Sequence, residues 1–335
     1  MPPSVTVIIA AYNAQDTLAR AVRSALSEPE TAEVIVVDDA SGDATCAVAG
    51  HLAQADTRVR LMTSRANQGP AAARNRALDA ATAEYVAILD SDDVFLPGRL
   101  ARLLACDGAD MVADNIAFVT AENLGGLPDD TWRGMVPTFR PLGTAAFVRG
   151  NLRTRGVARG ELGFLKPVMS RAFLNRYHLR YDPALRLGED YDLYVRMLLA
   201  GAVLKLTHYP GYAAVVRQTS LSAQHGAAEL VQLHDRLASH LSTTGLSPDL
   251  VRAMQAHLDE VRRKRDHRLF LDLRRRQGAR AAIRYLFGAV NRALPVAGQI
   301  ARDKLGLSAM AGEAAPASGV RLLLPMDKQA SALAR

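Results

Sequence analysis

The sequence predicts an α/β fold with a mainly parallel sheet, followed by a helical extension, and three observations support this prediction. First, short apolar runs alternate four times with stretches in which apolar residues recur at helical spacing, as they do when strands are joined by right-handed crossover helices. Second, these runs lack the apolar–polar alternation of half-exposed strands, which indicates strands covered on both faces. Third, the chain beyond residue 226 is helical in pattern and rich in Arg.

Strands and helices follow one another closely in the first part of the chain. The apolar runs predict strands at 5–11, 33–37, 59–62 and 85–89, and the spacing between them predicts helices at 14–26, 45–55 and 69–81. From about residue 111 the pattern loosens and predicts order at 163–174, a helix at 190–200, and strands at 203–206 and 212–216. We therefore expect a main domain at 1–225 (halves of about 1–110 and 111–225), a basic helical extension at 226–308 and a disordered tail at 309–335.

Composition and charge exclude several classes of protein. Of the 335 residues, 49% are hydrophobic and 22% are charged, which excludes a wholly disordered or fibrous chain. The net charge is +7, but the segment from Arg252 to Lys304 has fourteen Lys or Arg against five acids and carries +9, which leaves −2 for the rest. The protein is therefore a near-neutral body with a basic end.

Cysteine content and hydropathy bear on location. The two cysteines, Cys46 and Cys106, supply neither a disulfide framework nor a four-ligand zinc site, so a reducing, cytosolic environment is expected. The N-terminus lacks the charged region of a signal peptide, and the chain has no uncharged apolar run of about 18 residues that would span a membrane. We expect a soluble or peripheral protein.

Polar residues follow each of the four predicted strands: Tyr12-Asn13, Asp38-Asp39, Asn67, and Asp90 to Asp93. Ligands of open parallel sheets bind at the carboxyl ends of the strands, so these side chains should share one site. Neither GxGxxG nor GxxxxGKS/T occurs, which excludes the usual dinucleotide and P-loop sites. Tyr12 is either a ring that stacks on a nucleobase or a half-buried packing residue.

Two groups of acids need an explanation. Asp38 is explained equally well as a cap of the following turn, whereas a second adjacent acid, Asp39, suits a carboxylate that accepts from N3–H of uracil. Asp90, Asp92 and Asp93 would raise one another's pKa unless a cation were present, and Mg²⁺ or Mn²⁺ holding a diphosphate would supply that cation. A helix N-terminus explains Asp93 but not all three acids.

Four blocks carry a resemblance to a known family: VTVIIAAYNA, EVIVVDDASGD, NQGPAAARNRAL and YVAILDSDD. In this order they resemble the inverting GT-A glycosyltransferases of family 2 over about residues 4–225, and the resemblance implies the GT-A fold, a Rossmann-like sheet flanked by helices. It implies that Ala11 and Tyr12 contact uridine and that Asp39 binds uracil. By the same resemblance Arg74 lies near the nucleotide.

The resemblance also assigns the acids of the reaction. Asp90 and Asp92 match the first and last acids of the family's DXD motif, and Asp92 is the implied direct ligand of Mn²⁺ or Mg²⁺. Glu189 and Asp190 match an acidic pair beside the acceptor, in which Asp190 is the base that single displacement requires. Without the family, this pair is better explained as the start of a helix.

The loop after the last predicted strand gives weaker indications. Arg217 is either a phosphate contact in a loop that closes over the diphosphate or an exposed loop arginine. The QxxRW signature of processive synthases is absent, and the only tryptophan, Trp132, lies far upstream. One sugar per acceptor is therefore expected.

Three shorter blocks, MVADN, GFLKP and LGED, resemble the bacterial glucosyltransferases of succinoglycan-type exopolysaccharide synthesis. This resemblance implies a UDP-hexose donor, first UDP-glucose, and a lipid-linked oligosaccharide acceptor at the inner face of the bacterial plasma membrane. Lys166 then faces the acceptor or its diphosphate, or it is a solvated loop lysine. Another nucleotide sugar on a different glycan is the alternative.

The basic end interleaves Arg with apolar residues over 261–286. Such helices suit an anionic membrane surface, where each basic residue contributes about 1 kcal/mol. The alternative is a helix whose Arg stems cover apolar surface while their heads stay in water. Nucleic acid is a rival partner, but no recognisable reading motif or stacking platform accompanies the charge, and we expect no nucleic-acid partner.

Overall fold

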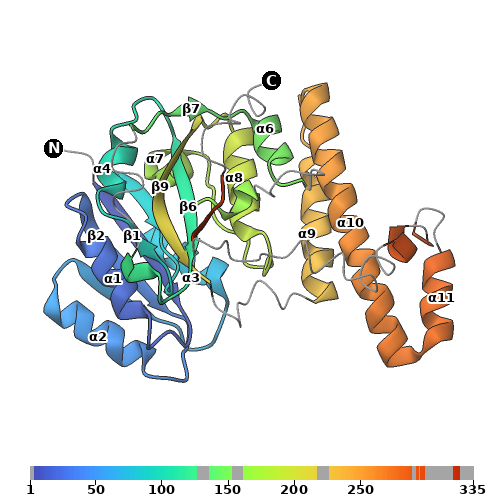
Figure 1. Cartoon of the computed structure of the whole chain (residues 1–335), viewed down its shortest axis with the longest axis horizontal. Coiled ribbons are helices and arrows are strands. Elements are labelled where there is room, and N and C mark those ends of the chain that lie inside the picture. Colours follow the sequence, from blue (N-terminus) through green and yellow to red (C-terminus); the bar gives the residue numbers. More distant parts are fainter. Residues whose placement is uncertain are drawn as a thin grey trace. The chain divides into compact units, whose positions relative to one another are not determined.

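The computed structural model describes residues 4–126, 136–152, 161–216, 226–288, 292–293, 295–298 and 320–324. The chain forms two compact units, one made of residues 1–218 and 319–335 and the other of residues 219–318. Figure 1 shows the elements of both.

The first unit contains the sheet and the helices that cover it (Figure 1). Its strands are β1 (Val5–Ala11), β2 (Thr31–Asp38), β3 (Val59–Thr63), β4 (Tyr85–Ile88), β5 (Val94–Phe95), β6 (Met111–Val119), β7 (Arg140–Pro141), β8 (Val168–Ser170), β9 (Leu204–Val215) and β10 (Val320–Leu322). Its helices are α1 (Leu18–Leu26), α2 (Thr45–Ala55), α3 (Pro70–Ala80), α4 (Arg99–Leu104), α6 (Thr144–Arg149), α7 (Arg171–Arg176) and α8 (Glu189–Leu199), with 3₁₀ turns at Leu124–Gly126 and Leu162–Phe164.

The strand order β3-β2-β1-β4-β8-β6-β9-β5 confirms a mixed, mainly parallel sheet. β1 pairs in parallel with both β2 and β4, and β2 pairs in parallel with β3, whereas β8 is antiparallel to β4 and β6. The chain moves outward from β1 to β3 and then returns to β4, so right-handed crossovers place α1 and α2 on one face and α3 on the other. The reversal between β1 and β4 is the switch point at which such sheets bind ligands.

The strands form where the sequence analysis expected because their apolar runs are buried on both faces. Val7, Ile8, Val36 and Ile88 are all fully buried. Each such side chain contributes roughly 1.5–3 kcal/mol by leaving water. The site at the strand ends therefore rests on a rigid core.

Two predicted strands, at 203–206 and 212–216, are one continuous strand, β9. The strand continues through Pro210, which lies opposite Asn115 where the register of β6 and β9 shifts, a position that tolerates proline. Gly211 is required by its neighbour, since a Cβ there would come within 1.9 Å of Asp114 Oδ2.

The predicted disordered tail contains a strand. β10 pairs antiparallel with β6, and the following Leu323 and Leu324 are 3% and 1% exposed. The side-chain amide of Asn115 accepts from the Leu324 N–H at 2.8 Å and donates to the Leu324 carbonyl at 3.0 Å. The prediction was wrong for residues 320–324 because their order comes from pairing with a strand distant in sequence.

The second unit is helical, as predicted. It contains α9 (Ala227–His240), α10 (Pro248–Gln277) and α11 (Ala279–Phe287). Ser247 caps α10 by accepting from the Leu250 N–H at 3.3 Å, and Gly278, with a φ of 85°, separates α10 from α11. Within the described ranges, no helix has the length and hydropathy needed to cross a membrane.

Candidate active site

The loop after β1 is held by hydrogen bonds to the loop after β2. Asn13 has a φ of 50°, and its side-chain oxygen accepts from the Gly42 N–H at 2.9 Å. Ala11 is buried, whereas the Tyr12 ring is 51% exposed at the switch point. The structure thus leaves about half of the Tyr12 side chain accessible, and its predicted stacking on a nucleobase stays a prediction.

The Asp39 carboxylate, directly after β2, binds the backbone of the loop that precedes α3. Asp39 is 3% exposed, and its carboxylate accepts from the N–H groups of Gln68 at 3.0 Å and Gly69 at 2.7 Å. Gly69 has a φ of 89°, and a Cβ there would come within 1.8 Å of the Arg186 guanidinium. Asp39 therefore anchors the loop that begins α3, and its predicted contact with uracil stays a prediction.

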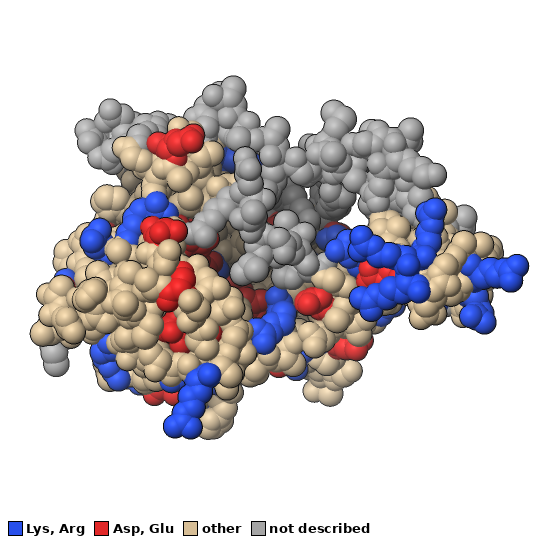
Figure 2. Space-filling model, turned by 90° about the horizontal axis from the view of Figure 1, so that it is seen from below, with Lys and Arg blue, Asp and Glu red and all other residues tan. Residues whose placement is uncertain are grey.

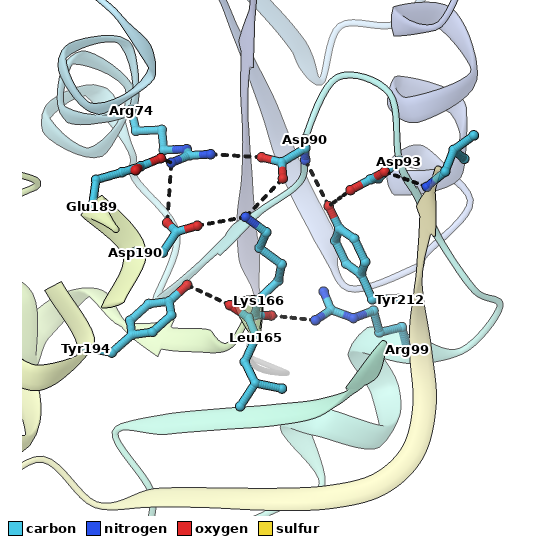
Figure 3. A network of polar contacts seen from close by, with 11 residues as sticks. Arg74, Asp90, Asp93, Arg99, Leu165, Lys166, Glu189, Asp190, Tyr194 and Tyr212 are labelled. Carbon is cyan, nitrogen blue, oxygen red and sulfur yellow. Dashed lines mark hydrogen bonds and ion pairs between the residues drawn. The ribbon is translucent and has the colours of Figure 1, made fainter. Parts of the chain in front are cut away.

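Four charged residues from four different segments converge at the switch point, and Glu189 extends the group (Figure 3). Lys166 Nζ lies 2.9 Å from Asp90 Oδ2 and 2.8 Å from Asp190 Oδ2. The Arg74 guanidinium lies 2.8 Å from Asp90, 3.0 Å from Glu189 and 3.3 Å from Asp190. We call Arg74, Asp90, Lys166, Glu189 and Asp190 the charge cluster.

The charge cluster is buried at its cations and more open at one acid. The side chains of Arg74 and Lys166 are 6% and 7% exposed, whereas that of Asp90 is 32% exposed. The hypothesis that Lys166 is a solvated loop lysine is therefore wrong. Burying such charges is costly unless they are paired, and here each cation has at least two carboxylate partners.

The pairing moves the pKa values of the cluster in opposite directions. Burial alone would raise the pKa of Asp90, but the Lys166 ammonium and the Arg74 guanidinium outweigh it and hold that pKa well below its usual value. Burial would lower the pKa of Lys166, but Asp190 and Asp90 outweigh it and raise that pKa above its usual value. Both groups are therefore charged at neutral pH.

Helix α8 presents Asp190 from its first turn. Gly188, with a φ of 76°, precedes the helix, and Glu189, Asp190 and Asp192 lie in its first turn, where acids interact favourably with the helix dipole. Asp192 turns away to pair with Arg196 at 2.7 Å. Asp190 instead turns to the cluster, so a helix N-terminus alone does not account for it.

A set of buried contacts supports the backbone at Lys166, and no pattern in the sequence predicted these contacts. Tyr194 of α8 donates to the Leu165 carbonyl at 2.9 Å, and Arg99 donates to the Lys166 carbonyl. The Arg99 guanidinium is fully buried and forms a bidentate pair with Asp114 at 2.8 and 2.9 Å. These contacts fix the backbone that carries Lys166.

Asp93 holds the acidic loop to β9. It accepts from the Tyr212 hydroxyl at 2.8 Å and from the Val215 N–H at 2.8 Å, and the same hydroxyl accepts from the Asp90 N–H at 3.1 Å (Figure 3). Burial, followed by the charges of Asp90 and Asp92, raises the pKa of Asp93 to about 8. Asp93 is thus a supporting residue, but its explanation as a helix N-terminal acid is wrong, because it precedes β5 and binds β9 rather than capping α4.

Asp92 is the remaining acid of the DXD motif. It is partly exposed, and its carbonyl accepts from Arg20 at 3.0 Å. In the described part of the chain no three His, Cys, Asp or Glu residues are grouped so that they could hold a metal ion. Asp90 and Asp92 are the carboxylates that would hold Mg²⁺ or Mn²⁺, which commonly bind one or two carboxylates together with substrate phosphates, and both Asp90 oxygens bind Arg74 and Lys166 in this structure.

Arg217 lies outside the described residues. β9 ends at Val215, two residues before it, so its predicted phosphate contact stays a prediction.

Comparisons with known proteins identify the family of the chain. Residues 6–149 match the family described as Glycosyl transferase family 2. The chain is 44% identical over 315 residues to the succinoglycan biosynthesis protein ExoU of Rhizobium meliloti, covering 94% of this chain and 92% of ExoU. It is 38% identical over 225 residues to ExoO of the same organism, covering 66% of this chain and 63% of ExoO.

Solved structures show the same fold. Staphylococcus aureus TarS residues 1–349 with UDP-GlcNAc matches with a TM-score of 0.57 and 18% identity, covering 82% of this chain and 74% of TarS. The mannosyltransferase PcManGT of Pyrobaculum calidifontis with GDP-Man and Mn²⁺ matches with a TM-score of 0.56 and 19% identity, covering 92% and 81%. The predicted GT-A fold is confirmed, and the chain belongs to glycosyl transferase family 2 and is a glycosyltransferase.

Proposed function

We propose that this glycosyltransferase transfers one hexose from a UDP-sugar to a lipid-linked saccharide with inversion at the anomeric carbon. The observation that carries the proposal is the cluster itself, in which Asp190 and the DXD residue Asp90 share Lys166 at 2.8 and 2.9 Å. A base for the acceptor and an acid from the donor-binding motif thus lie on opposite sides of one ammonium group.

The chemistry is a single displacement. Asp190 accepts the proton of an acceptor hydroxyl, whose oxygen forms a bond to the anomeric carbon while the bond from that carbon to the β-phosphate oxygen breaks. UDP leaves from the opposite face, so an α-linked donor gives a β-linked product. Arg74 and Lys166 orient the Asp190 carboxylate by hydrogen bonds of 3.3 and 2.8 Å.

A bound Mn²⁺ or Mg²⁺, held by Asp92 and Asp90, would supply positive charge to the leaving diphosphate. The chain's own residues hold the donor on the other side: Tyr12 by stacking on the base, Asp39 at uracil, and Ala11 by leaving room for the ring. Arg217 is proposed to contact the diphosphate, and Glu189 to contact the acceptor.

The names of relatives support the donor and acceptor classes. ExoU and ExoO are named as succinoglycan biosynthesis proteins. The Escherichia coli protein WfgD, 34% identical over 116 residues, is named as a UDP-Glc:α-D-GlcNAc-diphosphoundecaprenol β-1,3-glucosyltransferase. We therefore propose a role in bacterial exopolysaccharide or other surface glycan synthesis, with UDP-glucose as the first donor to test.

The lipid-linked acceptor implies work at a membrane. We propose that the protein is cytoplasmic and peripheral on the inner face of the plasma membrane, with its basic helices toward anionic lipid. Membership of family 2 favours this over a nucleic-acid-binding role.

The experiment is donor hydrolysis over a panel of UDP- and GDP-sugars with Mn²⁺, Mg²⁺ or chelator. The proposal predicts preferential, metal-dependent release of UDP, with UDP-glucose the best substrate. Preferential release of GDP would overturn the UDP assignment, and equal release in chelator would overturn the metal assignment. A different UDP-sugar as best substrate would favour the alternative of another donor on a different glycan.

A further inference from the structure

One face of α11, which carries Ala282 and Tyr285, packs against α10. This packing fixes which side of α11 faces away from α10. Ala282 is 1% exposed and shares a small core with Phe270 and Val296, against which Tyr285 packs. The Tyr285 hydroxyl donates at 3.0 Å to Asp266, an acid of α10 that is 6% exposed. α11 therefore folds back beside the end of α10 (Figure 1) with one face committed to packing.

The opposite face of α11 consists of Arg280, Ile283, Arg284 and Phe287, all exposed. Their spacing of i, i+3, i+4 and i+7 places them on one side of the helix. Ile283 is 52% exposed and Phe287 is 77% exposed. We call these four residues the outer face of α11.

Arginines surround this apolar pair. Arg274, Arg275 and Arg276 end α10 just before α11 and are also exposed. In the described part of the chain, none of these three, Arg280 or Arg284 forms an ion pair with an acid. Figure 2 shows Lys and Arg side chains projecting from this part of the molecule, at the right of the view. The surface thus combines uncompensated positive charge with exposed apolar side chains.

We propose that the outer face of α11 is a membrane-binding surface that inserts Ile283 and Phe287 into an anionic bilayer while the arginines stay at the level of the headgroups. Arginine suits this position because its stem is apolar and its head remains hydrated or pairs with phosphate. The negative potential of anionic lipid complements the unpaired charge. This surface refines the membrane placement proposed above, but it is tested without any step of glycosyl transfer.

Other occupants fit this surface less well. Nucleic acid would match the arginines, but it gives no reason to expose Ile283, which has no ring to stack on a base. A second copy of the same chain would bring arginines against arginines. Pairing with a second copy is an outcome of the second experiment below.

The first experiment is sedimentation of the full chain with vesicles of phosphatidylcholine alone or mixed with phosphatidylglycerol. We expect binding only to the anionic vesicles, and binding at least about tenfold weaker for I283S/F287S. V251S is the matched control, since Val251 is an exposed apolar residue (39%) of the same unit, and it should bind as the wild type does. Binding of I283S/F287S equal to wild type, or equal binding to both kinds of vesicle, would overturn the proposal.

The second experiment tests insertion directly. Trp132 is the only tryptophan, so F287W in a W132F background places a single reporter on the outer face. We expect a blue shift on anionic vesicles and quenching by lipids brominated on the acyl chain. A reporter that stays unquenched while the protein is bound would overturn insertion, as would a concentration-dependent dimer in light scattering that I283S/F287S abolishes. No nucleotide sugar or acceptor is present, so the result is independent of the proposed reaction.

Discussion

The Lys166 ammonium lies 2.8 Å from the Asp190 carboxylate and 2.9 Å from the Asp90 carboxylate. One buried cation therefore links the residue we assign as the base to the motif that we expect to hold the donor. Because the Lys166 backbone is itself fixed by Arg99 and Tyr194, through the Lys166 and Leu165 carbonyls, the link is rigid. The site has a fixed arrangement of charges before substrate arrives, which is the condition for electrostatic catalysis.

Replacing this cation should damage transfer. In Lys166→Met, Asp190 loses its 2.8 Å partner, and a misplacement of about 1 Å can cost about a hundredfold in rate. We expect kcat/KM for transfer to fall by roughly 10- to 100-fold, together with a lower Tm because Asp190, which is buried, and Asp90 both lose a partner. The control is Lys205→Met, since Lys205 contacts the Asp107 carbonyl outside the cluster. Unchanged kcat/KM in Lys166→Met would contradict this role.

The stability of the metal-free protein should decline with pH because of Asp93. Its pKa is 3.8 in its ordinary state and about 8 when folded, so between these values the folded protein keeps a proton that the unfolded chain loses. The free energy of unfolding therefore falls as pH rises through this window. Asp93→Asn should remove the decline, which denaturant melts at pH 5 and pH 8.5 would measure. Asp107→Asn, at an exposed acid, is the control; a decline that persists in Asp93→Asn would show that another group causes it.

Removing the Leu323 side chain should destabilise the sheet. Leu323 is 3% exposed, and truncation of a buried leucine costs about 2–5 kcal/mol. We expect Leu323→Ala to lower Tm by several degrees. Val203→Ala is the control, since Val203 is 43% exposed and surface substitutions change stability by about 0.5 kcal/mol or less. A Tm for Leu323→Ala that matches this control would show that the residues directly after β10 do not contribute to the stability of the fold.

Metal-dependent binding of UDP should depend on Asp92. In Asp92→Ala we expect calorimetry to show the same UDP affinity with and without Mn²⁺, because the proposed direct ligand is lost while the proposed nucleotide contacts, Tyr12 and Asp39, remain. Asp107→Ala controls for the loss of one negative charge elsewhere. If UDP affinity in Asp92→Ala still rises with Mn²⁺, the ion has other ligands.

The parallel half of the sheet could be predicted from the sequence because its signals are local. Strands buried on both faces read as continuous apolar runs, and acids directly after Val37 and Leu89 mark the ends of two of them. Asp90 could be predicted for this reason and by resemblance to the family, whereas Asp190 could be predicted by that resemblance alone.

The supporting contacts could not be predicted, because they depend on pairing between distant segments. Lys166 lies 24 residues from Asp190, and nothing in a loop lysine's own sequence tells whether it is buried. The pair of Arg99 with Asp114, and the clamp of Asn115 on Leu324 across 209 residues, likewise have no local pattern. Three of these residues, Asp114, Asn115 and Lys166, lie in the blocks MVADN and GFLKP. Only the resemblance of these blocks to the bacterial glucosyltransferases indicated that they matter.

The most direct test of the central claim is the activity and UDP binding of Asp190→Asn. The variant keeps the shape of the side chain but removes the base, so we predict that transfer is abolished while UDP binding with Mn²⁺ is largely retained. Asp79→Asn, at an exposed acid paired with Arg180, should transfer as the wild type does. Retained turnover in Asp190→Asn would contradict the assignment of Asp190 as the base.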